Sequence, residues 1–323
     1  MKKLFILLLG AVVLGMTACD NTPKAPGNPN QQSGQVDSAD FYFKRAVVEY
    51  DREQVAQALL DVNKSIDLNP ENVDAYMLLS ELYYYLGDEA GITTALDRAM
   101  ELDPFDTRPM VKMAKLSLLQ QNYNLAFGFI GNALDINTFN PEAYYVKGMI
   151  YLAKQDTAMA LKNLLIAREQ DAEFYDPQRE ICGIYLAQND PLAVNFMRSL
   201  VEQFPNQPKA RYDLALYLQD HGAPEEALAH YDTLLTQQPN NSRLLFNKGY
   251  VYFIYLNDNE QALNYFDQAL QSDPDYVDAL YNKGHVYERM GNFAQAKAIY
   301  SEVLNRYPSY QLAVDAMKRV KGR

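Results

Sequence analysis

The chain has 323 residues, of which 48% are hydrophobic, and it carries 41 acidic against 29 basic side chains. This hydrophobic content excludes a wholly disordered chain, and the length allows two ordinary domains or one long repetitive one. A formal charge of -12 argues against non-specific binding to nucleic acid or to anionic lipid headgroups, which requires clustered Lys and Arg.

Residues 1–18 have the layout of a bacterial secretory signal. A basic start precedes an apolar run from Leu4 to Gly15, and this run of about twelve residues is shorter than the ~20 that a membrane-spanning helix needs. Small residues lead into Cys19, which resembles the lipobox of bacterial lipoproteins, although Met16 stands where that family prefers Leu. The resemblance implies cleavage before Cys19 and lipidation of its sulfur, hence membrane attachment without a transmembrane helix. The alternative is an ordinary cleaved signal followed by an incidental cysteine.

Residues 19–38 are predicted to form a lipid-anchored flexible tether. From Asp20 onward the composition shifts to Asn, Gln, Pro, Gly and Ser, with almost nothing to bury. A coil of this length has a root-mean-square reach of roughly 25 Å, which separates a folded part from a lipid surface. We therefore expect a lipid-anchored protein of the bacterial cell envelope, in the outer membrane, with the periplasmic or the surface face left undecided.

A ladder of prolines gives the period of the remaining chain. Its members are Pro70, Pro104, Pro205, Pro239, Pro274 and Pro308. The intervals are 34, 101, 34, 35 and 34 residues, and 101 is three periods of 34 less one. The ladder therefore has a single period, with silent positions at Thr138 and Ala172 where helices end without proline. A period of 34 is typical of a repeat made of a helix, a turn and a second helix.

The residues between the prolines follow the same period. In the last full repeat, the seven characteristic positions are filled in order by a large apolar residue, a small residue, an aromatic residue, a turn glycine, an alanine, a second aromatic residue and the closing proline. These residues are Leu280, Gly284, Tyr287, Gly291, Ala296, Tyr300 and Pro308. This pattern resembles the tetratricopeptide repeat, in which small residues let two helices approach closely. The resemblance covers eight repeats, at approximately 39–72, 73–106, 107–140, 141–174, 175–207, 208–241, 242–276 and 277–310. The fifth fits worst, because Gln178 replaces a large apolar residue and Asp190 and Pro191 shorten the turn.

The predicted fold is all-α. Residues 39–310 are expected to form a right-handed superhelical α-solenoid of helix-turn-helix repeats. The amphipathic stretch at 311–323 is expected to be a capping helix, which covers the open end of the stack. Each repeat contacts only its neighbours, so the first helices of the repeats are expected to line a concave groove.

The resemblance also implies which side chains line that groove. They include Phe43, Lys44, Tyr50, Tyr84, Tyr85, Lys112, Lys115, Tyr145, Arg179, Tyr212, Phe246, Asn247, Tyr250, Tyr281, Asn282, His285 and Arg289. Tyrosines accompanied by amide and cationic groups offer flat apolar contact and hydrogen bonds to a peptide or protein. The open alternative is that these rings only pack between adjacent repeats.

The sequence gives no support for catalysis or metal binding. It contains no nucleophile elbow, no glycine-rich phosphate loop and no HExxH motif. Cys19 and Cys182 match no zinc spacing, and the three histidines are scattered. Cys182 occupies a small-residue packing position, so we expect a buried, inert thiol. We therefore expect a non-enzymatic protein with no metal site and no cofactor.

The expected function is a scaffold or adaptor at a bacterial envelope membrane that binds a protein or peptide in the concave groove. The lipid anchor is its only expected membrane contact, and no nucleic acid partner is expected. The alternative is a glycan-binding lipoprotein whose groove tyrosines stack on sugar rings. The absence of tryptophan counts against that alternative, because indole is the favoured sugar-stacking ring. The sequence leaves the partner, the process and the oligomeric state open.

Overall fold

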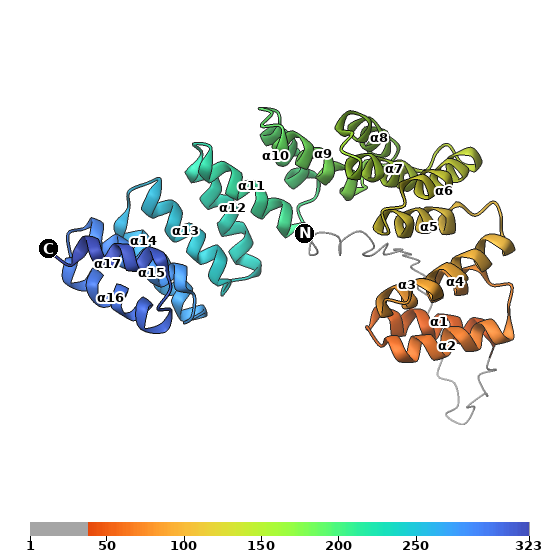
Figure 1. The fold of residues 1–323 in the computed structure, drawn as a ribbon, viewed down its shortest axis with the longest axis horizontal. Coiled ribbons are helices and arrows are strands. Elements are labelled where there is room, and N and C mark those ends of the chain that lie inside the picture. The colour runs from red at the N-terminus through yellow and green to blue at the C-terminus, as the bar shows by residue number, and fades with distance from the viewer. Residues whose placement is uncertain (1–37, 323) are drawn as a thin grey trace, which may run out of the picture. The chain divides into compact units, whose positions relative to one another are not determined.

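The computed structural model describes residues 38–322, which form seventeen helices and no strand. The predicted signal segment, Cys19 and the tether up to residue 37 lie outside the described residues. Within these residues, the predicted all-α arrangement of successive helical hairpins is confirmed (Figure 1). None of the described helices is both long and apolar enough to cross a bilayer.

The hairpins fall into two compact units. The first ends at Pro177 and the second begins at Gln178, so the division lies inside α9 (Tyr175–Ala187). The other helices of the first unit are α1 (Ala39–Asp51), α2 (Val55–Leu68), α3 (Val73–Leu86), α4 (Glu89–Leu102), α5 (Thr107–Leu119), α6 (Tyr123–Ile136), α7 (Pro141–Ala153) and α8 (Thr157–Gln170). The other helices of the second unit are α10 (Ala193–Gln203), α11 (Pro208–Asp220), α12 (Pro224–Gln237), α13 (Ser242–Ile254), α14 (Asn259–Ser272), α15 (Val277–Arg289), α16 (Phe293–Arg306) and α17 (Gln311–Val320).

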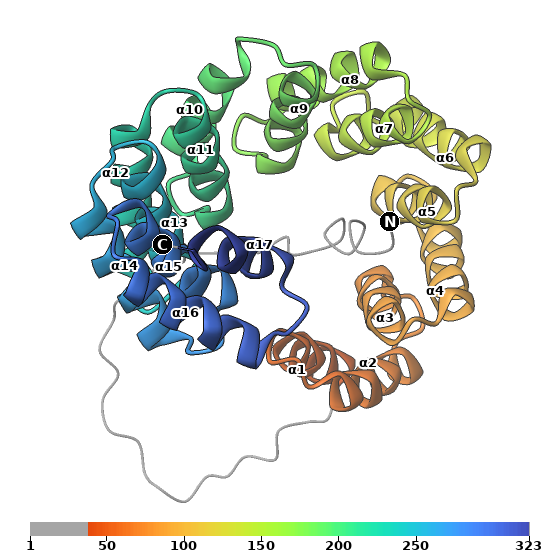
Figure 2. The ribbon, with the colours of Figure 1, turned by 60° about the vertical axis from the view of Figure 1, so that its left-hand side comes forward.

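The odd-numbered helices form one face of each unit. Within a hairpin, an odd helix packs on the even helix that follows it, as α1 does on α2 and α13 on α14. Odd helices of neighbouring hairpins also contact one another directly, α1 with α3 and α5 with α7 in the first unit, and α15 with both α13 and α17 in the second. In the first unit, Figure 2 shows α3, α5 and α7 as the inner row. We call the face formed by the odd helices the inner face of a unit, and the predicted groove positions lie on these helices.

Each of the eight hairpin turns contains one residue in the left-handed conformation. These residues are Glu53, Gly87, Gln121, Gln155, Asn189, Gly222, Asn257 and Gly291. Glycine adopts this conformation without a steric cost, asparagine tolerates it, and for most other residues it costs about 1–2 kcal/mol. The turns at Glu53, Gln121 and Gln155 therefore depend on the packing of the two helices that they join.

Small residues set the distance between the two helices of a hairpin. A Cβ atom at Gly249 would lie 2.8 Å from the ring of Phe266, and one at Gly284 would lie 2.8 Å from the ring of Tyr300. Both rings are fully buried. The helices therefore approach so closely that no side chain fits at the glycine position.

The last helix closes the end of the second unit. α17 buries Ala313, Ala316 and Val320 in the apolar cluster that α15 and α16 form. Arg319 donates two hydrogen bonds of 3.0 Å to the carboxylate of Glu288 on α15. The predicted capping helix is thus confirmed, and it is held by both apolar burial and an ion pair.

Candidate functional site

Aromatic side chains line up on the inner face of the second unit. They come from α11, α13 and α15 and from the residues that cap the N-termini of α15 and α17. We call this set the aromatic row, and its members are Tyr212, Phe246, Tyr250, Phe253, Tyr276, Tyr281, His285 and Tyr310. The row joins predicted groove residues from three successive repeats.

Ring contacts run from one repeat to the next within the aromatic row. The ring centroid of Phe246 lies 5.1 Å from that of Tyr276 and 6.1 Å from that of Tyr250. Further along, the Tyr281 centroid lies 5.6 Å from Tyr310 and 6.0 Å from His285. These separations are those of tilted and edge-to-face aromatic pairs, which hold each ring in a defined orientation.

Burial divides the row into supporting and accessible rings. Phe253 and Tyr281 are 1% and 8% exposed, whereas the other six rings are only half-buried: Tyr212, Phe246, Tyr250, Tyr276, His285 and Tyr310. Burial also lowers the pKa of the His285 imidazole below its usual value. The six half-buried rings, with a neutral imidazole among them at physiological pH, are therefore the apolar surface that a ligand can contact.

Polar groups beside the rings are held by internal hydrogen bonds. The amide of Asn247 is 8% exposed and donates to the hydroxyl of Tyr212 at 3.1 Å. Asn282 donates to the backbone oxygen of Asp278 at 2.8 Å. These bonds fix the orientation of amides that lie next to the accessible rings.

Two arginines give the accessible surface its positive charge. Arg289 is exposed, its guanidinium carbon lies 3.9 Å from the centroid of Phe253, and its Nε donates to Asn259 at 3.1 Å. Arg243 is exposed on α13 and forms no ion pair with any residue that the structure describes. Both guanidinium groups can therefore donate hydrogen bonds to acceptor atoms of a ligand.

Two predicted cationic groove residues of the first unit, Lys112 and Lys115, pair with carboxylates of neighbouring repeats. Lys112 on α5 bonds to Glu81 on α3, and Lys115 bonds to Glu142 on α7 at 2.6 Å. A small cleft adjoins the first pair and is lined by Ser80, Glu81, Tyr84, Ile92, Leu96, Lys112, Leu116 and Leu119. In this unit the inner-face charges therefore tie one repeat to the next.

The remaining predicted groove residues lie in different surroundings. Tyr145 is 2% exposed and packs edge-to-face on Phe174 at 5.3 Å, whereas Tyr85 is 63% exposed. Phe43 and Tyr50 pack against the buried core that the first two hairpins share. Exposed Lys44 pairs with Asp40 at 2.8 Å, and Arg179 pairs with Glu180. These residues do not form a shared surface comparable to the aromatic row.

Sequence reasoning missed three members of the aromatic row, which are Phe253, Tyr276 and Tyr310. Tyr276 and Tyr310 are 34 residues apart, and each follows a proline of the ladder by two positions. The period itself could therefore have identified them. They cap helices outside the groove positions that the family resemblance supplied, which is why they were missed.

The structure also places the groups that could carry chemistry. Within residues 38–322, no three or more His, Cys, Asp or Glu side chains are arranged to hold a metal ion. Cys182 is 5% exposed, and burial raises the pKa of its thiol to about 11. The buried thiol predicted at this position is confirmed.

Family comparison supports the repeat assignment in the second unit. Models of the tetratricopeptide repeat match residues 185–242, 212–254 and 254–319. Residues 185–319 are thus similar to tetratricopeptide repeats. The matched residues include the whole aromatic row. A search of curated proteins finds no match.

Several solved structures are similar to the chain. The C-terminal part of a TPR repeat-containing protein from Cytophaga hutchinsonii is 17% identical with a TM-score of 0.55, over 85% of this chain and 99% of that one. YrrB, described as a TPR protein with an unusual peptide-binding site, is 26% identical with a TM-score of 0.47, over 58% of this chain and 97% of its own. The Cut9-Hcn1 structure of the APC/C is 16% identical with a TM-score of 0.48, over 89% of this chain and 57% of that one. The first of these likenesses supports the fold.

Proposed function

We propose that the protein is a non-enzymatic scaffold that binds a protein or peptide segment on the inner face of the second unit. The observation that carries the proposal is the aromatic row, in which half-buried rings lie beside oriented amides and the exposed guanidinium groups of Arg243 and Arg289. Such rings lose their remaining contact with water when a partner covers them, and tyrosine and arginine are enriched among the residues that dominate interface energies.

The arrangement suits a polypeptide ligand because its parts are already positioned. Ring contacts hold Phe246 and Tyr250, and a hydrogen bond holds Asn247 against Tyr212. Preorganised side chains lose little conformational entropy on binding. A polypeptide supplies both apolar side chains for the rings and backbone acceptors for the arginines.

A photo-crosslinking amino acid at position 250, in the full-length protein in its native membrane, tests the proposal. We expect a crosslinked polypeptide that mass spectrometry identifies, because this half-buried ring belongs to the row and lies 6.1 Å from the ring centroid of Phe246. The same amino acid at Leu60, which is 66% exposed on α2, is the control and should not capture that polypeptide. With the purified partner, Tyr250→Ala should weaken binding at least tenfold, which corresponds to about 1.4 kcal/mol, and Leu60→Ala less than twofold.

Two outcomes of this experiment contradict the scaffold proposal. Equal capture at positions 250 and 60 would mean that the aromatic row is not the binding surface. Saturable binding of cell-wall oligosaccharides in calorimetry, lost in Tyr250→Ala without any polypeptide capture, would support the glycan-binding alternative instead.

We further propose that Cys19 is lipidated and anchors the protein to a bacterial envelope membrane, with the outer membrane as the expected location. The support is the sequence of the signal segment, whose apolar run ends a few residues before this cysteine. Lipid chains stabilise membrane attachment by ~0.8 kcal/mol per buried CH₂. Cys19→Ser should therefore move the protein into the soluble envelope fraction, and Cys182→Ser is the matched control that should leave it at the membrane. Retention of Cys19→Ser at the membrane after a high-salt wash would contradict the anchor.

A further inference from the structure

One edge of the first unit combines exposed phenylalanines with acidic loops. This edge consists of the four connections between consecutive hairpins, each taken with the two helix residues on either side, at residues 67–74, 101–108, 135–142 and 169–176. Phe105 is 79% exposed and Phe139 is 64% exposed, each at the same place in its connection. Leu68 and Ile136 are also exposed beside them. We call this surface the loop edge.

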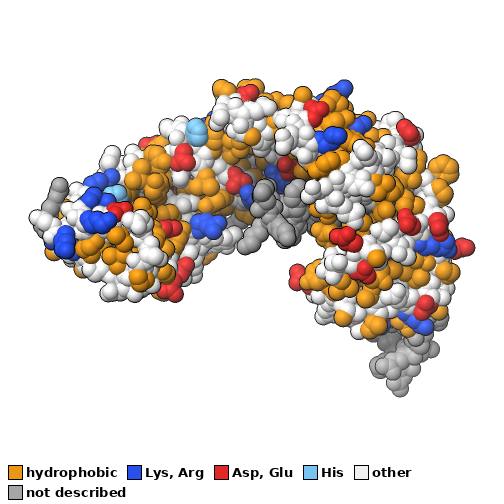
Figure 3. Space-filling view, viewed as in Figure 1, with side chains coloured by type: hydrophobic (Ala, Val, Ile, Leu, Met, Phe, Trp, Pro, Cys, Tyr) orange, Lys and Arg blue, Asp and Glu red, His pale blue; other side chains and the backbone are white. Residues whose placement is uncertain are grey.

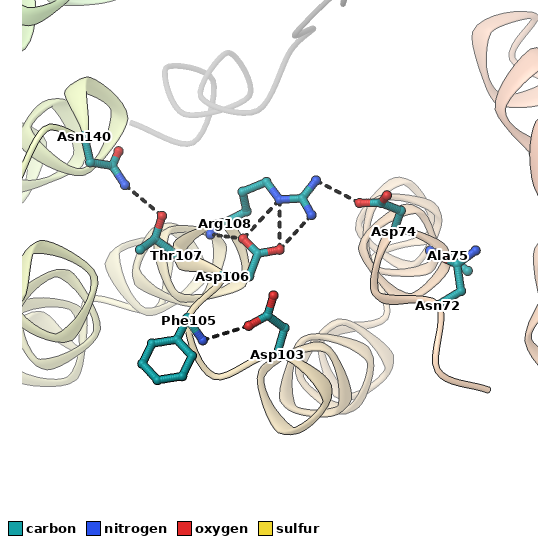
Figure 4. A network of polar contacts seen from close by, with 9 residues as sticks. All are labelled: Asn72, Asp74, Ala75, Asp103, Phe105, Asp106, Thr107, Arg108 and Asn140. Atoms are coloured by element: carbon teal, nitrogen blue, oxygen red, sulfur yellow. Dashed lines mark hydrogen bonds and ion pairs between the residues drawn. The ribbon is translucent and has the colours of Figure 1, made fainter. Parts of the chain in front are cut away.

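Hydrogen bonds join neighbouring connections into one continuous surface. The side chain of Asn140 donates to the hydroxyl of Thr107 at 3.0 Å, and Arg108 links Asp106 to Asp74 with ion-pair distances of 2.7 and 2.8 Å. Figure 4 shows this network, with the ring of Phe105 pointing away from the Asp106–Arg108 pair. The polar network therefore organises the loops and leaves the ring free for contact.

The loop edge is strongly acidic. Its four segments, helix ends included, contain twelve acidic residues and one basic residue, Arg108. The corresponding segments of the second unit, at 202–209, 236–243, 271–278 and 305–312, contain four acidic and three basic residues. On the visible face of the first unit in Figure 3, acidic side chains lie next to hydrophobic surface. The repeat fold therefore does not require acidic residues in these segments. The large excess of acidic residues is a feature of the first unit.

Local structure requires neither the charge nor the rings. The carboxylate of Asp103 accepts a hydrogen bond from the backbone of Phe105 at 3.0 Å, and neutral Asn137 does the same for Phe139 at 3.0 Å. In the second unit, polar residues replace the two phenylalanines, and Asn206 and Asn240 are examples. Exposed phenylalanines that the fold does not need indicate an interaction surface.

We propose that the loop edge is a docking surface for a basic polypeptide segment that carries apolar side chains. The carboxylates attract and orient a cationic partner, and Phe105 and Phe139 provide apolar contacts at the centre. The same carboxylates repel anionic lipid headgroups. This surface is separate from the aromatic row of the second unit, and the proposal does not depend on the function proposed for that row.

Binding of two synthetic peptides to the full mature chain, made soluble with Cys19→Ser, tests the proposal. One is an amphipathic Lys/Leu peptide, and the other is a Lys/Ser peptide of the same length and charge. Phe105→Ser with Phe139→Ser should weaken binding of the Lys/Leu peptide at least tenfold. The melting curve of the protein should stay unchanged, because both rings are exposed. Leu60→Ser with Met290→Ser, at positions 66% and 52% exposed, is the matched control and should change affinity less than twofold.

A second pair of variants isolates the charge. Glu71→Gln with Glu173→Gln removes two exposed carboxylates from the loop edge, and Glu225→Gln with Glu260→Gln removes two exposed ones from the second unit. The first pair should weaken binding of the Lys/Leu peptide at least threefold at physiological salt, and the second pair should weaken it less than 1.5-fold. Equal losses in the two pairs would mean that the net charge of the chain attracts the peptide, and would overturn the proposal.

A vesicle experiment tests the competing occupant. The start of α1 lies beside the end of α2 at the loop edge, because the hydroxyl of Ser65 donates to the backbone oxygen of Ala39 at 2.8 Å. If Cys19 is lipidated as proposed, the chain leads from the lipid to this edge, and a lipid surface is therefore the competing occupant. If Phe105→Ser with Phe139→Ser abolishes binding to phosphatidylcholine vesicles and leaves peptide affinity unchanged, the edge contacts lipid and the proposal is wrong. Tyr250→Ala should leave binding at the loop edge unchanged, which separates this result from a failure of the function proposed for the second unit.

Discussion

Gly249→Leu is expected to lower the free energy of unfolding of the second unit by about 3 kcal/mol. A Cβ atom at this position already lies 2.8 Å from two ring carbons of Phe266 and 3.3 Å from the backbone oxygen of Ala262. Phe266 is fully buried, so the ring cannot move aside without disturbing the core that it shares with α15. Denaturant unfolding followed by circular dichroism measures the change.

Gly183→Leu is the matched control for this substitution. Gly183 is exposed on α9, and no atom lies within 4 Å of a Cβ built there, so leucine should raise stability by up to ~1 kcal/mol through helix propensity. Phe266→Ala alone should cost about 4 kcal/mol. In the double variant Gly249→Leu with Phe266→Ala, the space left by the ring accommodates the leucine. The stability loss of the double variant should therefore be at least 1 kcal/mol smaller than the sum of the losses of the two single variants. Additive losses would show that Gly249 and Phe266 do not set the helix distance.

The 34-residue period predicted the helical hairpins because the fold itself is periodic. Small residues such as Gly249 and Gly284 recur where two helices touch, and large residues such as Phe266 and Tyr300 recur opposite them. Both features are consequences of packing within one repeat. A single sequence therefore contains enough copies of the pattern to define it.

The conformational preferences of single residues predict the turns less well than the period does. Gly87, Gly222 and Gly291 have the positive φ angle that glycine favours, but Glu53 and Gln121 adopt the same conformation with φ angles of 60°. Nothing in the local sequence predicts that conformation for glutamate or glutamine. The packing of the two flanking helices imposes it, so only the period gives the position of these turns.

The candidate site was predictable in part. The groove positions implied by the family resemblance placed Tyr212, Phe246, Tyr250, Tyr281 and His285 on the inner face of the second unit. In the structure these residues belong to one row of rings. The prediction that they bind a ligand awaits the crosslinking experiment. The chain divides into two compact units at Pro177, inside the fifth repeat, which fits the sequence pattern worst; the pattern alone does not predict the division.

The pairing of the first-unit lysines could not be derived from the register. Lys112 bonds to a glutamate 31 residues earlier, and Lys115 bonds to one 27 residues later. Neither separation equals the period, because each pair also depends on the direction in which long side chains extend between neighbouring helices. Such contacts require coordinates.

Deleting residues 309–323 is expected to lower the melting temperature of the second unit by roughly 10 °C, equivalent to ~4 kcal/mol at ~2–4 °C per kcal/mol. The deletion removes three fully buried residues of α17 and exposes Tyr281, Tyr300 and Val303, which are buried in the intact protein. It also removes the hydrogen bond of 2.6 Å that the hydroxyl of Tyr310 donates to Asp278. The uncovered rings form an apolar patch, so light scattering should detect aggregation at lower temperature.

Point substitutions within α17 distinguish apolar burial from the other contributions of the helix. Ala316→Asp places a carboxylate at a fully buried position and should reproduce most of the deletion's effect, whereas Leu312→Ser, at a position 54% exposed, should leave melting unchanged. Arg319→Met keeps the apolar stem and removes the ion pair with Glu288, so its effect should be smaller than that of Ala316→Asp. If Ala316→Asp melts like the intact protein, α17 does not stabilise the second unit by burial. If only Arg319→Met lowers the melting temperature, the ion pair rather than apolar contact holds the cap in place.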